Sequence, residues 1–188
     1  MSTSTYRILY FPTVGRATAS FLMLDYAGAT WTPEFITEWP VKRQDIPFDR
    51  LPVLHETNPQ TKESFVLSES RPIERYLAQT LGLYHPLPKG VEDDCDSAVT
   101  TSAHNLAKQT EALQEAYVSQ WEDVVDACLV LVFDSETHKE EKIARMKRRA
   151  RQLLEKHGSI LDKNPSGQAF YFGDQPVWVD FAAYAGWQ

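Results

Sequence analysis

The pattern of hydrophobic and polar residues changes character along this chain, close to residue 83. The first part contains short runs rich in β-branched and aromatic residues, each followed by a turn signal. The clearest run, Tyr6–Tyr10, predicts a strand that ends at Phe11-Pro12. A helix is expected to start near Gly15, because apolar residues then recur at helical spacing and Gly28 offers a natural end. The apolar stripe of that helix consists of Ala19, Leu22, Met23 and Tyr26.

Three further runs in this part have the composition of strands. Thr30–Ile36 is a strand candidate that Pro33 weakens, because proline cannot donate to a sheet ladder. Val53–Glu56 and Phe65–Leu67 are short strands joined by the turn Asn58–Thr61.

A helix closes the first part of the chain. The spacing predicts it over Glu69–Leu81, with Gly82 as its end and Ser68 or Ser70 as its cap. Its apolar face consists of Ile73, Leu77 and Leu81. The order is β-α-β, an irregular stretch, then β-β-α, which is the arrangement of a thioredoxin-like α/β domain.

The second part of the chain has helical periodicity throughout. A long helix is expected from Asp93 to about Phe133, and a second one over Lys139–His157 that Gly158 ends. The expected inward residues of the first are Val99, Ala103, Leu106, Leu113, Tyr117, Trp121 and Val124, and those of the second are Ile143, Met146, Ala150, Leu153 and Leu154. We therefore expect a thioredoxin-like domain over 1–83, a linker over 84–90 and an all-helical domain over 91–188.

Composition narrows the class of function. The formal net charge is −7, so the many Lys and Arg residues of the second long helix are read as a solvated face and not as a nucleic-acid surface. No run of 18 or more apolar residues predicts a membrane span, and the polar start is unlike a signal peptide. The two cysteines, Cys95 and Cys128, lie far apart and form no CxxC motif or metal site. A cytoplasmic protein with no metal, membrane or nucleic-acid partner is expected.

Three positions in the first part are candidates for chemistry, and each has a purely structural alternative. Tyr10 ends the first strand just before a helix, where a phenol could donate to an anion, although a strand tyrosine is commonly a core residue. Leu51-Pro52 is a candidate cis bond that would expose the backbone of Leu51, but trans is the ordinary form. Glu69 and Ser70, at a helix start, could bind an ammonium and a carboxylate, or could simply cap the helix.

The order and spacing of these positions resemble a known family. The segments YRILYFP-x-x-GRA, RLPVL and SES-x-x-IERYLA, with a later Phe172-Gly173-Asp174 and Asp180-Phe181, are similar to those of cytosolic glutathione transferases of the tyrosine type, most closely the pi and sigma-like members. The resemblance implies an enzyme that uses glutathione as a co-substrate, with no permanently bound cofactor, and transfers it to small hydrophobic electrophiles. It also implies a homodimer.

The resemblance assigns a role to each matching residue. Tyr10 matches the catalytic tyrosine, and Phe48 matches the aromatic key that enters the other subunit. The glutathione-binding residues it implies are Arg16, Trp39, Arg43, Arg50, Leu51, Pro52 (as a cis-proline), Glu69 and Ser70. Arg50 stands where glutamine is usual.

The chain departs from the family pattern at two places, and the second departure leaves a second interpretation open. Val177 stands where a capping Ser or Thr is usual, and the family pattern continues beyond Gln188 through further helices. On that basis four aromatic residues are expected to be unusually exposed or covered by a partner: Trp178, Phe181, Tyr184 and Trp187. A non-catalytic binding or interaction module with this fold is therefore the alternative. A cysteine-type oxidoreductase is not supported, because the first domain contains no cysteine.

Overall fold

The computed structural model describes residues 4–39, 46–84, 98–133 and 139–187. The chain divides into two compact units, the first reaching Leu83 and the second spanning Tyr84–Trp187. The predicted linker and Arg43 lie largely or wholly outside the described residues.

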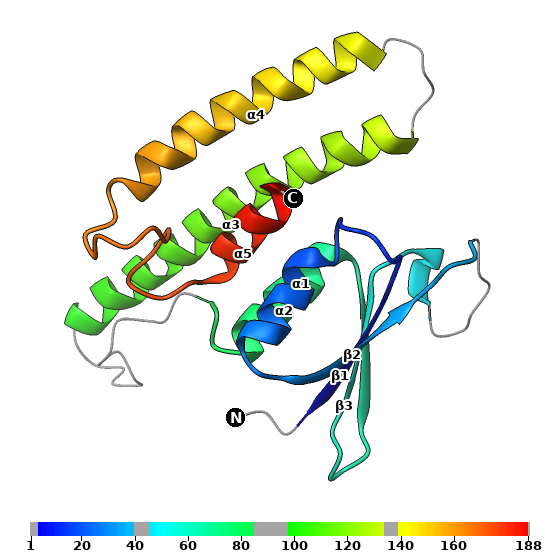
Figure 1. Cartoon of the computed structure of the whole chain (residues 1–188). Helices are drawn as coiled ribbons and strands as arrows, with labels where there is room; N and C mark the ends of the chain where they lie inside the picture. Colours follow the sequence, from blue (N-terminus) through cyan, green and yellow to red (C-terminus); the bar gives the residue numbers. More distant parts are fainter. Residues whose placement is uncertain (1–3, 40–45, 85–97, 134–138, 188) are drawn as a thin grey trace. The chain divides into compact units, whose positions relative to one another are not determined.

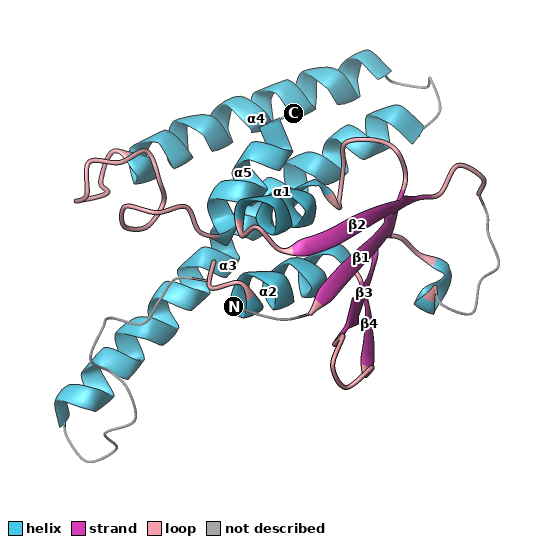
Figure 2. Ribbon diagram, turned by 60° about the horizontal axis from the view of Figure 1, so that its bottom comes forward, coloured by secondary structure: helices cyan, strands magenta, loops and turns pink. Residues whose placement is uncertain are grey.

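The first unit is a four-stranded mixed sheet with helices on one face, as the sequence predicts (Figures 1 and 2). The strand order is β2-β1-β3-β4; β1 pairs with β2 in parallel and with β3 antiparallel, and β3 pairs antiparallel with β4. The strands are β1 (Thr5–Tyr10), β2 (Thr30–Phe35), β3 (Val53–Thr57) and β4 (Ser64–Ser68). Pro33 is accommodated because β2 is an edge strand, where one side needs no ladder hydrogen bond.

Two helices, α1 (Thr18–Tyr26) and α2 (Ser70–Thr80), pack against each other on the same face of the sheet. The core between helices and sheet is fully buried and aliphatic. It includes Ile8, Met23, Leu24, Leu54, Ile73 and Leu77. A second cluster joins Leu9 and Val53, which are partners across β1 and β3, to Ile46 in the segment that leads to the 3-10 turn η1 (Pro47–Asp49).

Two local predictions for this unit are wrong. The buried face of α1 includes Ser20 and Leu24, whereas Tyr26 is 52% exposed at the last turn. The cap of α2 is Glu69, with no side-chain cap hydrogen bond, and Ser70 is already the first helical residue.

The second unit is helical, with α3 (Ala98–Phe133) in contact with both α4 (Lys139–Leu161) and α5 (Trp178–Trp187). The buried face of α3 agrees with the prediction at Trp121 and Val124. Earlier in the helix it is displaced by about one residue, because Leu106 and Leu113 are exposed while their successors Ala107 and Gln114 are buried. Helix α4 runs through Gly158 to Leu161, since Gly158 does not have the positive φ of a helix-ending glycine.

A polar network is buried where α3, α4 and the segment before α5 meet. Tyr171 Oη accepts a hydrogen bond from Trp121 Nε1 at 2.9 Å and contacts His157 Nδ1, while His157 Nε2 lies 3.1 Å from Gln120 Oε1. Because an amide oxygen only accepts, Nε2 carries the proton and Nδ1 accepts from the Tyr171 hydroxyl. His157 is therefore a neutral imidazole, and its 2% exposure makes it part of the core.

The start of α5 is held by one carboxylate. Asp180 Oδ2 accepts from the N–H of Val177 at 2.8 Å and Oδ1 accepts from the N–H of Tyr171 at 3.1 Å. One half of a capping box thus forms even though Val177 has no hydroxyl to complete the other half. The expected exposure of the last aromatic residues is wrong for Trp178, which is fully buried, whereas Tyr184 and Trp187 are 56% and 65% exposed.

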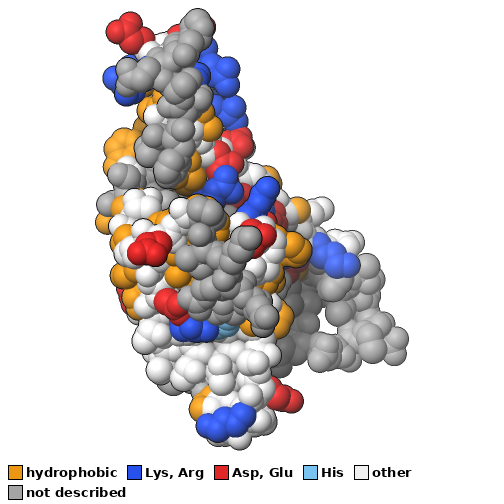
Figure 3. Space-filling model, turned by 90° about the vertical axis from the view of Figure 1, so that its right-hand side faces the viewer, with side chains coloured by type: hydrophobic (Ala, Val, Ile, Leu, Met, Phe, Trp, Pro, Cys, Tyr) orange, Lys and Arg blue, Asp and Glu red, His pale blue; other side chains and the backbone are white. Residues whose placement is uncertain are grey.

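The charged residues of α4 lie on a mixed surface. In Figure 3, basic and acidic side chains are interspersed over the α3–α4 pair at the top of the view. Arg149 of α4 forms an ion pair with Asp123 of α3. Within the described residues, no helix is long and apolar enough to cross a membrane.

Candidate functional site

A cavity of about 350 Å³ opens in the first unit at one edge of the sheet. The cross-strand partners Tyr10 with Phe35 and Val53 with Ser68 show that β1, β2 and β4 end at this edge and that β3 begins there. The loops that leave these strand ends supply its lining residues: Arg16, Trp39, Asp49, Arg50, Leu51, Glu69 and Ser70. Ligands of open α/β sheets bind at such an edge, beyond the carboxyl ends of the strands.

The cavity is lined by charges of both signs. Arg16 and Arg50 supply two guanidinium groups, and Asp49 and Glu69 supply two carboxylates. Ser70 adds the N-terminal turn of α2, where unpaired backbone N–H groups favour an anion. This set of groups suits a ligand that carries both carboxylates and an ammonium.

Tyr10 lies at the end of β1, beside this cavity but not in its lining. Its side chain is 4% exposed, and its Oη accepts a hydrogen bond from the backbone N–H of Arg16 at 2.9 Å. Burial raises the pKa of the Tyr10 phenol, and the Arg16 N–H and guanidinium oppose that rise. The phenol therefore keeps its proton at neutral pH and can donate it in a hydrogen bond.

The backbone around the cavity has unusual conformations. The Leu51-Pro52 peptide bond is cis, the conformation that the resemblance implies. Glu69 has φ of 75° and Asp49 has φ of 49°, which are values that a side chain disfavours. Glu69 also precedes the first residue of α2, so its conformation fixes where its carboxylate lies relative to the helix start.

The cavity thus brings together six of the predicted binding residues and adds one that was not predicted. Asp49 was missed because nothing in its sequence neighbourhood distinguishes it from a surface acid. Arg43 lies outside the described residues. Pro52 is buried, and Phe48 is 77% exposed without lining the cavity.

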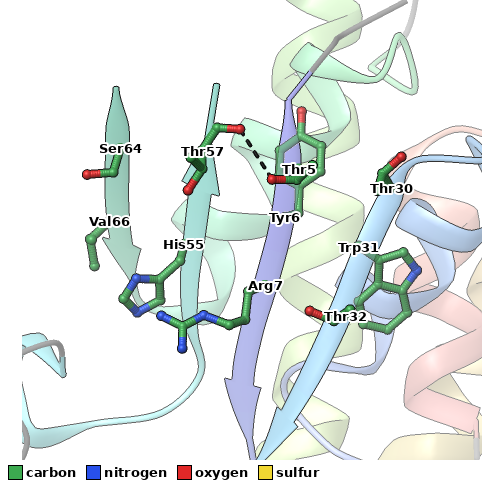
Figure 4. A pocket seen from close by; sticks show the side chains of 10 residues that line it. All are labelled: Thr5, Tyr6, Arg7, Thr30, Trp31, Thr32, His55, Thr57, Ser64 and Val66. Atoms are coloured by element: carbon green, nitrogen blue, oxygen red, sulfur yellow. Dashed lines mark hydrogen bonds between the residues drawn. The ribbon is translucent and has the colours of Figure 1, made fainter. Parts of the chain in front are cut away.

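A second hollow of about 550 Å³ covers the sheet face that the helices leave bare (Figure 4). Its lining is rich in hydroxyl groups, and Thr5 Oγ1 donates to Thr57 O at 3.4 Å. Arg7 lies next to His55 there and pairs with Glu34. The opposed charges that suit a zwitterionic ligand are in the smaller cavity instead. The described residues contain no group of three or more His, Cys, Asp or Glu placed to hold a metal ion.

The solved structures that share this fold include glutathione S-transferases. The sigma class GST of Fasciola hepatica matches with a TM-score of 0.72 at 20% identity, over 99% of this chain and 79% of that one. The glutathione S-transferase of Ascaris lumbricoides matches with a TM-score of 0.69 at 22% identity, over 95% of this chain and 77% of that one. These matches show that the chain has the glutathione S-transferase fold.

Sequence relatives agree with the structural matches, although no family model matches the chain. Glutathione S-transferase P of Bos taurus is 27% identical over 181 residues, which are 94% of this chain and 72% of that protein. The probable glutathione S-transferase 6 of Caenorhabditis elegans is 25% identical over 178 residues, 93% of this chain and 75% of that protein. In both sequence and fold, the chain is therefore similar to glutathione S-transferases.

Proposed function

We propose that this chain activates glutathione as a thiolate through Tyr10 and conjugates it to small hydrophobic electrophiles. The observation that carries the proposal is the buried Tyr10 hydroxyl, fixed by the Arg16 N–H beside a cavity of mixed charge. The names of the relatives support the same reaction class.

The cavity supports binding of glutathione in a single orientation. The tripeptide carries two carboxylates and one ammonium at neutral pH. Glu69 would pair with the γ-glutamyl ammonium, while Ser70, the helix start and Arg16 would hold the adjacent carboxylate. Trp39 and Arg50, together with Arg43, would hold the glycyl carboxylate at the other end. The backbone of Leu51 before cis-Pro52 would pair with the central cysteinyl unit.

The chemistry follows from the protonation states of two groups. A free thiol has a pKa of about 8.5, so it is mostly protonated at neutral pH. The Tyr10 hydroxyl stays protonated and would donate a hydrogen bond to the sulfur, and each unit by which this lowers the thiol pKa corresponds to about 1.36 kcal/mol. The thiol proton leaves to water. The thiolate then forms a carbon–sulfur bond to the electrophile, whose leaving group departs with the electron pair of the broken bond.

Turnover of a chloronitrobenzene with glutathione tests the proposal, with glutathione binding followed by calorimetry. The wild type should form the conjugate and release chloride. Tyr10→Phe should retain glutathione binding while its kcat falls roughly 10²-fold, as expected when one hydrogen bond to a reacting anion is removed. Ser159, which is exposed on α4 in the second unit, offers Ser159→Ala as a control that should leave both readouts unchanged.

The outcomes separate the two functions that the family fold allows. Binding of glutathione without any turnover by the wild type would favour the non-catalytic binding module. Absence of both binding and turnover would contradict the proposed function and the binding module together.

We also propose that the protein forms a homodimer through Phe48. This side chain is 77% exposed on a residue with φ of 59°. The family does not decide the question, because one matching solved structure, from Necator americanus, is described as monomeric. Sedimentation equilibrium should give a dimer for the wild type and a larger dissociation constant for Phe48→Ser; a wild-type monomer would contradict the proposal.

A further inference from the structure

We propose that Gly15 is a positioning residue for Tyr10, because only a residue without a side chain leaves room for the Tyr10 hydroxyl to reach the Arg16 N–H. The part of this inference that concerns turnover rests on the proposed function. The part that concerns the position of the hydroxyl rests on the geometry alone.

The available space at Gly15 is set by a single atom. A Cβ built on Gly15 would lie 2.6 Å from Tyr10 Oη, but 3.6 Å from Cζ and 3.7 Å from Cε1 of the same ring. The first distance is far inside van der Waals contact, whereas the other two are ordinary contacts. The clash therefore belongs to the hydroxyl oxygen and not to the ring, and a phenylalanine at position 10 would tolerate the same Cβ.

Neither partner can move away without losing contacts. The N–H of Gly15 donates to Thr18 Oγ1 at 2.9 Å, and its carbonyl accepts from the N–H of Thr18 at 3.0 Å, so the backbone is tied to the first turn of α1. The Tyr10 ring is 4% exposed, which limits the room into which it could swing. The φ of Gly15 is not in the left-handed region, so steric space and not backbone freedom is what requires glycine here.

The close approach determines what the hydroxyl can do. Tyr10 Oη uses one lone pair to accept from the Arg16 N–H at 2.9 Å, which leaves its hydrogen to be donated elsewhere. Accepting one hydrogen bond polarises the O–H group and strengthens the bond that it donates. A methyl group at position 15 would push the oxygen off this N–H, and a displacement of about 1 Å near the reacting atom can cost on the order of 10²-fold in rate.

A double-mutant cycle of Gly15→Ala and Tyr10→Phe tests the inference. Gly15→Ala should lower kcat by roughly 10²-fold with little change in KM for glutathione, and should shift the alkaline rise of the pH–rate profile upward. It should also lower the urea midpoint of unfolding. In the Tyr10→Phe background, the same substitution should change neither the residual rate nor the midpoint, because the clashing oxygen is absent. Gly158→Ala, at a glycine whose Cβ would meet nothing within 4 Å, is the matched control and should leave kcat unchanged.

Two results would overturn the inference: an equal effect of Gly15→Ala in both backgrounds, or no effect in the wild-type background. If Gly15→Ala alone does not fold, recovery of folding in the double variant supports the inference and failure of the double variant to fold overturns it. The unfolding midpoints test the position of the hydroxyl independently of turnover. A Tyr10→Phe variant with full activity would refute the proposed function, while the midpoints would still decide the role of Gly15.

Discussion

Neutral, buried His157 makes the stability of this protein sensitive to mild acid. Its Nδ1 accepts from the Tyr171 hydroxyl, and its Nε2–H faces Gln120 Oε1 at 3.1 Å. A proton added at Nδ1 would turn an acceptor into a donor opposite a hydroxyl that already accepts from Trp121. The Tyr171 O–H would then lose its acceptor inside the core. Burial accordingly lowers the pKa of His157 below its ordinary value of 6.5.

The sign and size of the effect follow from proton linkage. Below pH 6.5 the unfolded chain binds a proton at His157 that the folded chain does not, so the free energy of unfolding falls as the pH falls. The loss between about pH 7.5 and about pH 5.5 is at most about 1.4 kcal/mol, the limit in which only the unfolded chain takes up the proton. His157 and Asp180 both line a hollow in the second unit. Burial raises the pKa of Asp180 to about 6, so its contribution to the free energy of unfolding over this range has the opposite sign.

Urea unfolding of the wild type and of His157→Gln at both pH values separates the contributions of His157 and Asp180 to the free energy of unfolding. Glutamine does not titrate, so the wild-type free energy of unfolding minus that of the variant should fall from the higher pH to the lower, by up to about 1.4 kcal/mol. Asp180 is present in both proteins and cancels in this difference. A difference that is constant with pH, or that rises in acid, would refute the neutral assignment of His157.

Three further predictions test local packing and strain. Ser20 Oγ is buried without a hydrogen-bond partner, so Ser20→Ala should raise the free energy of unfolding by about 1 kcal/mol in urea. The Asn164 side-chain amide donates to the carbonyls of Gly173 and Phe170 at 2.7 and 2.8 Å. Asn164→Ala should therefore lower the free energy of unfolding by about 2 kcal/mol and speed proteolysis of that loop. Glu69→Gly should relieve the strain of a φ of 75° and raise the free energy of unfolding by about 1 kcal/mol. The same substitution should weaken glutathione binding roughly 10-fold in calorimetry, because it removes the carboxylate. Lys62→Gly, at φ of 62° outside the cavity, is the control that should leave binding unchanged.

The sequence was sufficient to predict the elements of the first unit, because each strand and helix there is short and bounded by a strong signal. Strand β2 was predicted correctly although it contains Pro33. At the edge of the sheet, the hydrogen bond that a proline cannot donate is not needed. The long helix α3 was predicted as an element, but its buried face was predicted only in part: Trp121 and Val124 are buried as expected, whereas Leu106 and Leu113 are exposed. Its apolar residues surround much of the helix, so periodicity alone could not show that Ala107 is buried and Leu106 exposed.

The residues of the candidate site were likewise predicted only in part. Glu69 was singled out by its position at a helix start, and the resemblance supplied Arg16 and Arg50. Asp49 follows no such signal and was not predicted. Gly15 was read only as a helix start, because its role depends on an atom of Tyr10 that lies across the loop. Such a contact is fixed by tertiary packing and has no signal in the residues beside it.

Backbone strain connects the fold to the proposed function. Four described non-glycine residues have positive φ, and two of them, Asp49 and Glu69, line the small cavity. Such a conformation costs on the order of 1–3 kcal/mol and persists only where the surrounding structure enforces it. At Glu69 the sheet enforces one side, through the end of β4, and the first turn of α2 enforces the other. A glycine would meet both constraints at lower cost but would bring no carboxylate, and in the proposed function this carboxylate is the group that pairs with the γ-glutamyl ammonium.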